Sequence, residues 1–411
     1  MTNAPPFATA ARFWIRLGFI SFGGPAGQIA ILHREVVEER GWLAERPFAD
    51  ALNFCMLLPG PEALQLAIYV GWKLHGVRGG LVAGLGFVLP SVALLLGLAW
   101  VYARFGAVPA VAGVLFGLKS AVVALVLQAL ARIGRHALHR PLHWALAVAT
   151  FAALEFTALP FPLILIVAAL LGVGATRGVA PPAPIEPAPA GGARAARVLG
   201  VGFALWGIPL AAVGLSLGLD SLWGRLYLFF TQAALVTFGG AYAVLAYVTQ
   251  HLVSGVGWVT AEQSVAGLAL AETTPGPLII VLQFMGFMAG WNRPAPLEPA
   301  AGAVLAALLA AWATFLPSFV FIFLGAPHLE RLTRNPRIAA ALAAITAAVV
   351  GIIATLAWLL AKVVWFPAGV GAGPRWGALV IAACAAWLLA RRRPGLLWVL
   401  GLASLSGLLL Q

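Results

Sequence analysis

Residues 57–65 read LLPGPEALQ, and residues 273–281 read TTPGPLIIV. The same Pro-Gly-Pro breaker therefore interrupts two apolar runs, once from Pro59 and again from Pro275. The residue before a proline avoids the helical region, glycine adopts turn conformations, and proline suits the first position of a new helix. We therefore expect one helix to end at each breaker and another to begin directly after it.

The composition around the breakers is that of an integral membrane protein. Of 411 residues, 62% are hydrophobic and 9% are charged, and the mean hydropathy is +0.98. A soluble domain carries about 25% charged residues, so this chain cannot cover a water-facing surface. The expected fold class is an all-α polytopic membrane protein. The net charge of +12 is attributed to arginines in short loops that orient the helices, so no nucleic-acid partner is expected.

Thirteen apolar runs approach or reach the length that crosses a bilayer. They are 12–32, 51–72, 81–103, 107–131, 142–158, 160–176, 198–219, 226–249, 264–290, 300–325, 337–362, 376–390 and 395–410. The sequence leaves open whether each short run in the pairs 142–176 and 376–410 crosses fully. The expected divisions are a first transporter repeat, a Pro/Ala/Gly-rich linker, an extra connecting span and a second, inverted repeat, at 1–176, 177–196, 197–221 and 222–411.

The basic residues predict an orientation. With the N-terminus inside and the sides alternating, 16 Lys and Arg residues fall inside and 8 fall outside. This bias predicts a multi-pass protein of the bacterial inner membrane, with a cytoplasmic N-terminus and a periplasmic C-terminus. The main exception outside is segment 33–50, which carries five acidic residues and three arginines and is interpreted as an amphipathic segment on the interface.

Other motifs keep the register of the two breakers. Phe-Gly-Gly at Phe22 and Phe238, and Gly-Trp at Gly41 and Gly257, recur at the same offset as the breakers, whereas Leu-Pro-Ser at Leu89 and Leu316 recurs at a larger offset after a longer loop. The chain is therefore interpreted as a tandem duplication. Seven crossings between equivalent points would reverse the second copy. The result would be two inverted-topology repeats with broken helices, an architecture typical of secondary transporters.

The broken helices also predict where a ligand binds. The first breaker lies about 12 Å along its expected span, near the middle of a bilayer. Free backbone N–H groups at that depth must face protein, water or a ligand, and a helix start presents about half a positive charge. Inverted copies would bring two such starts together, which favours a central anion site. A kink that serves packing alone is the alternative.

The candidate substrate-binding residues come from the breakers, the Phe-Gly-Gly motifs and isolated polar side chains. Ionisable groups inside apolar runs are expensive and usually functional. The alternative for the glycine motifs is close helix packing, for Glu62 a carboxylate that stabilises its own helix start, and for Lys119 a buried pair with Glu62, Glu155 or Glu272. The set is Ser21, Phe22, Gly23, Gly24, Pro25, Pro59, Gly60, Pro61, Glu62, Gln65, Lys119, Thr237, Phe238, Gly239, Gly240, Glu272, Thr274, Pro275, Gly276 and Pro277.

No cofactor, metal site or enzymatic activity is expected. Cys55 and Cys384 lie in apolar runs without a neighbouring metal ligand, and the pattern indicates small core residues. The sequence contains no Walker loop, no His-Glu-x-x-His motif and no Ser/His/Asp arrangement.

Taken together, FGGP at 22–25, REVVEERGWL at 34–43, LPGPEALQ at 58–65 and FVLPS at 87–91 resemble the chromate ion transporter (CHR) family. FGG, TPGP and FLPS in the second half extend the resemblance to the long-chain, two-domain members. The resemblance implies chromate efflux and resistance driven by the proton-motive force, with related members linked to sulfate. It also carries over Arg34, Glu35 and Trp42, whereas the second copy has Gln250 and His251 in place of the first two and Leu278 in place of Glu62.

The expected function is therefore a secondary transporter that exports chromate. A dianion leaving a negative interior gains roughly 4.6 kcal/mol per 100 mV, so the membrane potential alone would favour export. Uniport, symport and antiport all remain open, as do uptake of sulfate or another oxyanion and an anion channel. The expected partners are chromate or sulfate, protons as a coupling ion, the lipid bilayer and a second copy in a homodimer.

Overall fold

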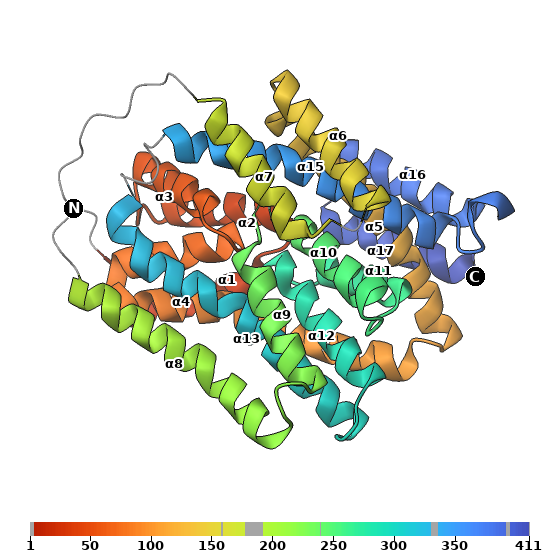
Figure 1. Ribbon diagram of the computed structural model, residues 1–411, viewed down its shortest axis with the longest axis horizontal. Coiled ribbons are helices and arrows are strands. Elements are labelled where there is room, and N and C mark those ends of the chain that lie inside the picture. The colour runs from red at the N-terminus through yellow and green to blue at the C-terminus, as the bar shows by residue number, and fades with distance from the viewer. Residues whose placement is uncertain are drawn as a thin grey trace.

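The computed structural model is built from helices, and no strand occurs in the residues it describes, 4–157, 159–176, 192–238, 240–329, 336–391 and 395–410 (Figure 1). This confirms the all-α expectation. Five helices are long and apolar enough to cross a membrane: α4 (Glu62–Phe105), α5 (Pro109–Ala137), α8 (Gly192–Ser216), α13 (Pro299–Gly325) and α15 (Pro336–Trp365).

The two halves of the chain repeat one order of elements. Besides α4 and α5, the first half contains α1 (Phe7–Ile20), α2 (Gly24–His33), the π-helix η1 (Arg34–Glu39), α3 (Glu45–Leu57), α6 (Pro141–Phe156) and α7 (Phe161–Gly174). Besides α13 and α15, the second half contains α9 (Leu222–Leu235), α10 (Ala241–Thr249), the π-helix η2 (Gln250–Gly255), α11 (Ala261–Thr273), η3 (Leu278–Ile280), α12 (Val281–Asn292), η4 (Ala326–His328), η5 (Val370–Ala372), α16 (Trp376–Arg391) and α17 (Leu396–Leu409). The starts of the π-helices share the offset of the breakers, and the starts of α5 and α15 share that of the Leu-Pro-Ser motifs.

Both Phe-Gly-Gly motifs reverse the direction of the chain. Phe13 of α1 packs against Trp42, which lies beyond η1, with ring centroids 4.8 Å apart. In the second half, Phe229 of α9 stacks on His251 of η2 at 4.0 Å. In each case a residue ahead of the break meets one well beyond it, so the flanking helices run back along each other. We name α1 with α2–η1 hairpin 1, and α9 with α10–η2 hairpin 3.

The Pro-Gly-Pro breakers reverse the chain as well. Gln263 near the start of α11 and Asn292 at the end of α12 exchange hydrogen bonds of 3.2 and 2.8 Å. In the first half, the rings of Phe54 on α3 and Tyr69 on α4 lie 6.5 Å apart, centroid to centroid. We name α3 with the first arm of α4 hairpin 2, and α11 with α12 hairpin 4.

These hairpins change the interpretation of four expected spans. Each of these runs forms two antiparallel helices rather than one span; they are 12–32, 51–72, 226–249 and 264–290. The count of thirteen spans is therefore not confirmed. The physical reason is a backbone turn at every tip, where at least one glycine has a positive φ that L side chains rarely adopt. These glycines are Gly23 at 96°, Gly60 at 121°, Gly240 at 94° and Gly276 at 86°.

Helix α4 consists of two arms. His75 and Gly76 leave the helical conformation, and they separate a first arm over 62–74 from a second arm over 77–105. Gly71 and Gly79 face each other across this turn so closely that a Cβ on either would overlap the carbonyl oxygen of the other. The second arm is the long apolar segment expected at 81–103.

Equivalent helices of the two halves pack against each other in opposite directions. A Cβ on Gly80 would touch the ring of Phe323, and a Cβ on Gly84 would touch the ring of Phe319. A step forward on α4 thus corresponds to an equal step back on α13, so these equivalent helices are antiparallel. The halves also exchange their last helices, since α6 and α7 pack on α15 while α16 and α17 pack on α5.

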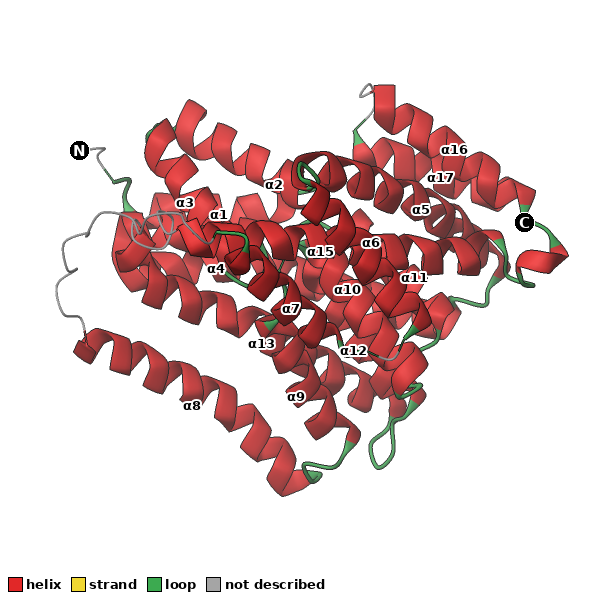
Figure 2. Cartoon of the chain, turned by 45° about the horizontal axis from the view of Figure 1, so that its top comes forward, coloured by secondary structure: helices red, strands yellow, loops and turns green. Residues whose placement is uncertain are grey.

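The packing departs from symmetry in one place. Hairpins 3 and 4 contact the central helices, α10 against α15 and α11 against α5. Their first-half equivalents, α2 and α3, make no comparable contact with α5 and α15 in the described residues. In Figure 2, α2 and α3 lie at one end of the molecule, whereas α10 and α11 lie among the central helices; α8 runs along one edge.

Candidate functional site

Two reciprocal hydrogen bonds join the four hairpin tips in two pairs. The N–H of Gly60 donates to the carbonyl oxygen of Thr237 at 2.9 Å, and the N–H of Gly276 donates to that of Ser21 at 2.8 Å. Each bond is the two-fold counterpart of the other, because Gly60 and Gly276, like Ser21 and Thr237, are equivalent positions of the repeat. The tip of hairpin 2 therefore contacts the tip of hairpin 3, and the tip of hairpin 4 contacts the tip of hairpin 1.

The Leu-Pro-Ser motifs complete this contact from across the molecule. A Cβ on Gly60 would lie 2.9 Å from Ser318 Oγ, and a Cβ on Gly276 would collide with Ser91. Ser91 Oγ donates to the carbonyl oxygen of Val88 at 2.8 Å, whereas Ser318 Oγ is buried with no partner among the described residues. Both serines were used in the sequence only to establish register. Each serine lies against the breaker of the other half, and this arrangement depends on tertiary contacts that the sequence does not show.

Three helices begin at the tips without a side-chain cap. The N-cap residues of α2, α4 and α10 are Gly23, Pro61 and Gly240, and none accepts a capping hydrogen bond. At the opposite ends of hairpins 3 and 4, by contrast, α9 and α11 are capped by Ser221 and Thr260. Helix starts without a side-chain cap carry partial positive charge, a feature that favours an anion beside them.

The hydroxyl groups expected as substrate donors are used within their own helices. Ser21 Oγ donates to the carbonyl oxygen of Leu17 at 2.7 Å, and Thr237 Oγ1 donates to that of Ala233 at 2.5 Å. The backbone carbonyl groups of Ser21 and Thr237, rather than their hydroxyls, hold the breakers. A Ser or Thr on the last turn of a membrane helix commonly bonds back to the preceding turn.

Two glutamines bind carbonyl groups of the breakers. Gln65 Nε2 donates to the carbonyl oxygen of Pro59 at 2.7 Å, and its buried Oε1 has no partner among the described residues. Gln28 Nε2 donates to the carbonyl oxygen of Gly276. Gln28 was missed in the sequence, although a buried amide one turn after a Phe-Gly-Gly motif is a signal that could have found it.

The two expected carboxylates occupy different environments. Glu62 lies in the first turn of α4, half-buried, where its carboxylate accepts a hydrogen bond from its own backbone N–H and forms no ion pair with the described residues. Glu272 is only 4% exposed and accepts a 2.6 Å hydrogen bond from the hydroxyl of Tyr242 on α10. Glu62 is therefore the more accessible of the two carboxylates, and its bond to its own N–H agrees with the alternative of a carboxylate that stabilises its own helix start.

The structure does not bring Lys119 to the tips. Its ammonium group lies 2.6 Å from Glu262, near the start of α11 and about 16 Å along that helix from the tip of hairpin 4. The partner is thus none of the three carboxylates considered in the sequence, and Glu155 instead pairs with Lys362 at 2.9 Å. Lys119 lines a separate cavity of about 430 Å³ together with Arg375.

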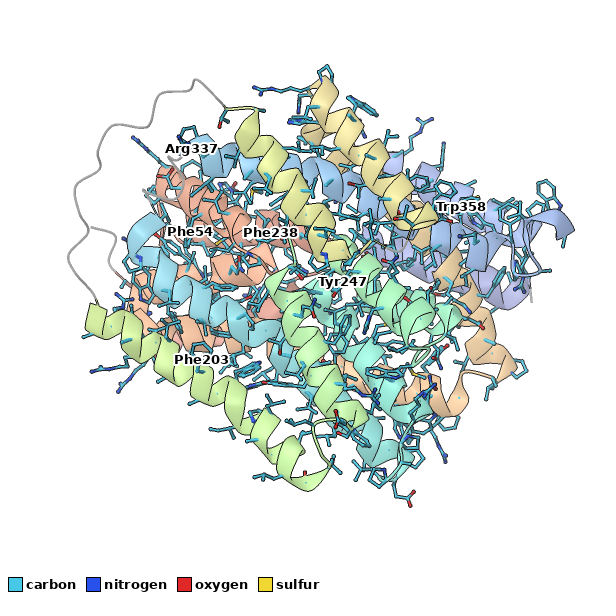
Figure 3. All side chains as sticks on the ribbon, in the orientation of Figure 1. Phe54, Phe203, Phe238, Tyr247, Arg337 and Trp358 are labelled. Carbon is cyan, nitrogen blue, oxygen red and sulfur yellow. The ribbon has the colours of Figure 1, made fainter. Side chains whose placement is uncertain are left out.

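The tips differ in their access to the surface. In hairpins 1 and 2, Gly23 is exposed and Gly24, Pro25, Pro59 and Glu62 are half-buried. In hairpin 4 the whole breaker, residues 274–277, is buried. In hairpin 3, Phe238 is half-buried near the middle of the assembly (Figure 3), and Gly239 lies outside the described residues. The first-half tips are thus accessible, and the second-half breaker is sealed.

A family described as chromate transporter matches residues 8–173 and 224–408 of this chain. The chain belongs to the chromate transporter family. Each matched stretch contains two of the hairpins, and α8 lies between them. The family is one of transporters and not of enzymes.

Relatives of known name agree with this assignment. A chromate transport protein of Pseudomonas aeruginosa is 34% identical over 342 residues, which cover 82% of this chain and 76% of the relative. A chromate transport protein of Cupriavidus metallidurans is 29% identical over 336 residues, 81% of this chain and 77% of the relative. An uncharacterized transporter of Methanocaldococcus jannaschii is 24% identical over 336 residues, 81% and 79% of the two chains. No solved structure matches the chain.

Proposed function

We propose that this chain exports chromate across the bacterial inner membrane and thereby confers chromate resistance. The observation that carries the proposal is the convergence of uncapped helix starts at the linked tips of four hairpins. Chromate is a tetrahedral dianion, and helix starts supply N–H donors from several directions without a permanent positive charge that would retain it. Broken helices that meet in this way form the substrate sites of several secondary transporters.

The two halves, 1–176 and 222–411, act as inverted-topology repeats joined by α8 and the linker 177–196, of which 177–191 lie outside the described residues. The antiparallel packing of α4 against α13 supports this proposal, because a two-fold axis perpendicular to those helices inverts one half. Hairpins 1 and 2 would enter the bilayer from one side, and hairpins 3 and 4 from the other. The substrate would then meet the tips from either side in turn.

The distribution of basic residues supports the same topology. If hairpins 1 and 2 are re-entrant, Arg34, Arg40 and Arg46 lie on the side of the N-terminus. The bias of Lys and Arg then rises from 16 against 8 to 19 against 5. The N-terminus is therefore placed in the cytoplasm and the C-terminus in the periplasm, and segment 33–50 is no longer an exception.

The substrate would first bind the tip residues that are accessible in this structure, and after a conformational change it would bind those that are buried here. In the present state the exposed or half-buried members are Phe22, Gly23, Gly24, Pro25, Pro59 and Glu62 of the first half and Phe238 and Gly240 of the second. Residues 274–277 would become accessible in a second state, in which hairpins 1 and 2 pack against the central helices and hairpins 3 and 4 do not. A dianion leaving a cell gains roughly 4.6 kcal/mol per 100 mV, so the membrane potential favours export.

The test is flux of radiolabelled chromate into everted membrane vesicles, with the potential and the pH gradient clamped separately. We expect saturable uptake that rises with an interior-positive potential and shows counterflow against preloaded chromate. Sulfate in place of chromate measures selectivity in the same vesicles. Uptake without saturation or counterflow would indicate a channel, and flux only in the opposite direction would indicate an uptake carrier; either result would overturn the proposal.

A further inference from the structure

A polar cluster lies on the sealed side of the tips and has no role in the site described so far. Glu272 of α11 and Tyr242 of α10 are 4% and 8% exposed and share a 2.6 Å hydrogen bond. Arg132 lies on the helix α5 against which α11 packs and is exposed, and its positive charge favours the ionised form of each group. The guanidinium of Arg132 forms no ion pair with any described residue.

The two-fold counterpart of this cluster is entirely apolar. The residues equivalent to Glu272, Tyr242 and Arg132 are Met56, Ala26 and Leu359, the first two at the offset of the breakers and the third at that of the Leu-Pro-Ser motifs. Three positions on three helices thus differ together in polarity. A buried carboxylate at membrane depth is costly, so the polar side is retained for a function that the apolar side does not perform.

Several other titratable groups on the helices around α11 are engaged elsewhere, and on α5 the side chains of Arg135 and His136, next to Arg132, bond to carbonyl oxygens of their own helix. On α5, Lys119 pairs with Glu262 at the far end of α11, and on α15, Lys362 pairs with a carboxylate of α6. On α4, Tyr102 lies near the carboxylate of Glu262, while α12 and η3 carry no titratable side chain. The guanidinium on α5 and the hydroxyl on α10 are therefore the groups that act on Glu272.

We propose that Arg132 and Glu272 form a linked site for an oxyanion and a proton. Arg132 binds the anion as it approaches the sealed tips, and Glu272 takes up a proton when it does so. The proposal rests on the proposed function, since the anion is the transported one. No covalent step is involved; a proton moves from water to the carboxylate of Glu272.

The sign of the coupling follows from charge. While Glu272 is ionised, its carboxylate occupies the field of Arg132 and repels a dianion. Protonation removes both effects, so the anion binds more tightly, and by reciprocity the bound anion favours protonation. Proton and oxyanion therefore bind together at this site. Antiport through Glu272 would require that they exclude each other, so this coupling is not antiport.

The experiment measures binding of radiolabelled sulfate to the purified full-length protein across roughly pH 5 to 9, where a buried carboxyl can titrate. Sulfate stays a dianion throughout this range, so its own protonation does not contribute. We expect affinity to rise on the order of tenfold as pH falls, a typical size for such coupling. The variants are made in the Glu62→Gln protein, so that this second carboxylate adds no pH dependence. In that protein Glu272→Gln should bind at the tight level at every pH, and Arg132→Gln should bind weakly without pH dependence.

Arg135→Gln is the matched control, because Arg135 is exposed on the same helix one turn away. It should retain the affinity and pH dependence of the Glu62→Gln protein. Binding to the Glu62→Gln protein without pH dependence, pH dependence that persists in Glu272→Gln, or equal losses in Arg132→Gln and Arg135→Gln would each overturn the inference. Absence of sulfate and chromate binding at every pH would instead overturn the proposed function.

Discussion

Replacement of Gly60 by alanine tests whether the breaker turn and its contacts hold the tips together. Gly60 has φ of 121°, a conformation that an L side chain rarely adopts. The added Cβ would lie 2.7 Å from Gln65 Nε2 and 2.9 Å from Ser318 Oγ. Both side chains would have to move, and the 2.7 Å hydrogen bond from Gln65 to Pro59 would be lost or stretched.

The expected cost follows from these terms. Backbone strain of this kind costs about 1 to 3 kcal/mol. Loss of one hydrogen bond adds about 1 kcal/mol. Gly41→Ala provides the matched control, because Gly41 also has a positive φ, 59°, but nothing lies within 4 Å of its added Cβ. The control should cost about 1 to 2 kcal/mol, so Gly60→Ala should be the more destabilising by about 1 to 2 kcal/mol.

Stability is measured as the thermal midpoint of the detergent-solubilised protein, and function as chromate flux in everted vesicles. We expect Gly60→Ala to have the lower midpoint and to lose flux, while Gly41→Ala retains flux. A second substitution, Ser318→Ala in the Gly60→Ala protein, removes one of the two close contacts and should restore part of the lost stability. Equal midpoints for the two single variants, or no recovery in the double variant, would refute the reasoning.

The remaining predictions concern topology, pH and charge. Single cysteines at Gly41 and Gly76 should both label from the cytoplasm, whereas continuous spans would place them on opposite sides. Hydrogen bonding to Glu45 raises the pKa of His33 from its usual value. The protonated His33 therefore contributes stability that is complete below about pH 6.5 and is lost as pH rises through the raised pKa. His33→Gln should accordingly lower the thermal midpoint at low pH and not at high pH. Lys119→Ala should keep flux within about twofold of wild type, since exposed pairs contribute little; a loss of flux would return this residue to the site. Glu62→Gln should tighten oxyanion binding, because a negative charge is removed, and should slow flux by retaining the substrate; unchanged binding would exclude Glu62 from the site.

Much of the fold is a local property of the chain. The apolar composition predicts membrane helices, and the breakers predict where helices end, since proline lacks an N–H and glycine permits positive φ. The register of the repeat predicts that the turns recur in the second half. The π-helices also recur in this register, although the sequence did not predict a π-helix in either half. These features depend on residues near one another in sequence and were therefore readable.

The reversal at each break could not be read in the same way. A kinked span and a hairpin both require a broken hydrogen-bond ladder, and the residues that break it are identical. The direction after Gly60 depends on contacts with Thr237 and Ser318 in the other half. The sequence contained one sign of the hairpins. If every run crossed the membrane, the three arginines of segment 33–50 would lie outside, against the bias of the other basic residues.

The candidate site divides along the same line. The sequence by itself determined an all-helical membrane protein, its internal duplication, its four helix breaks and the polar residues beside them, because each follows from local composition and spacing. Only the tertiary structure decided that the tips meet in pairs, that Lys119 lies far from them, and that α5, which carries Arg132, packs against α11, which carries Glu272. Those outcomes depend on how two halves of one chain pack, and packing brings together residues that no local pattern connects.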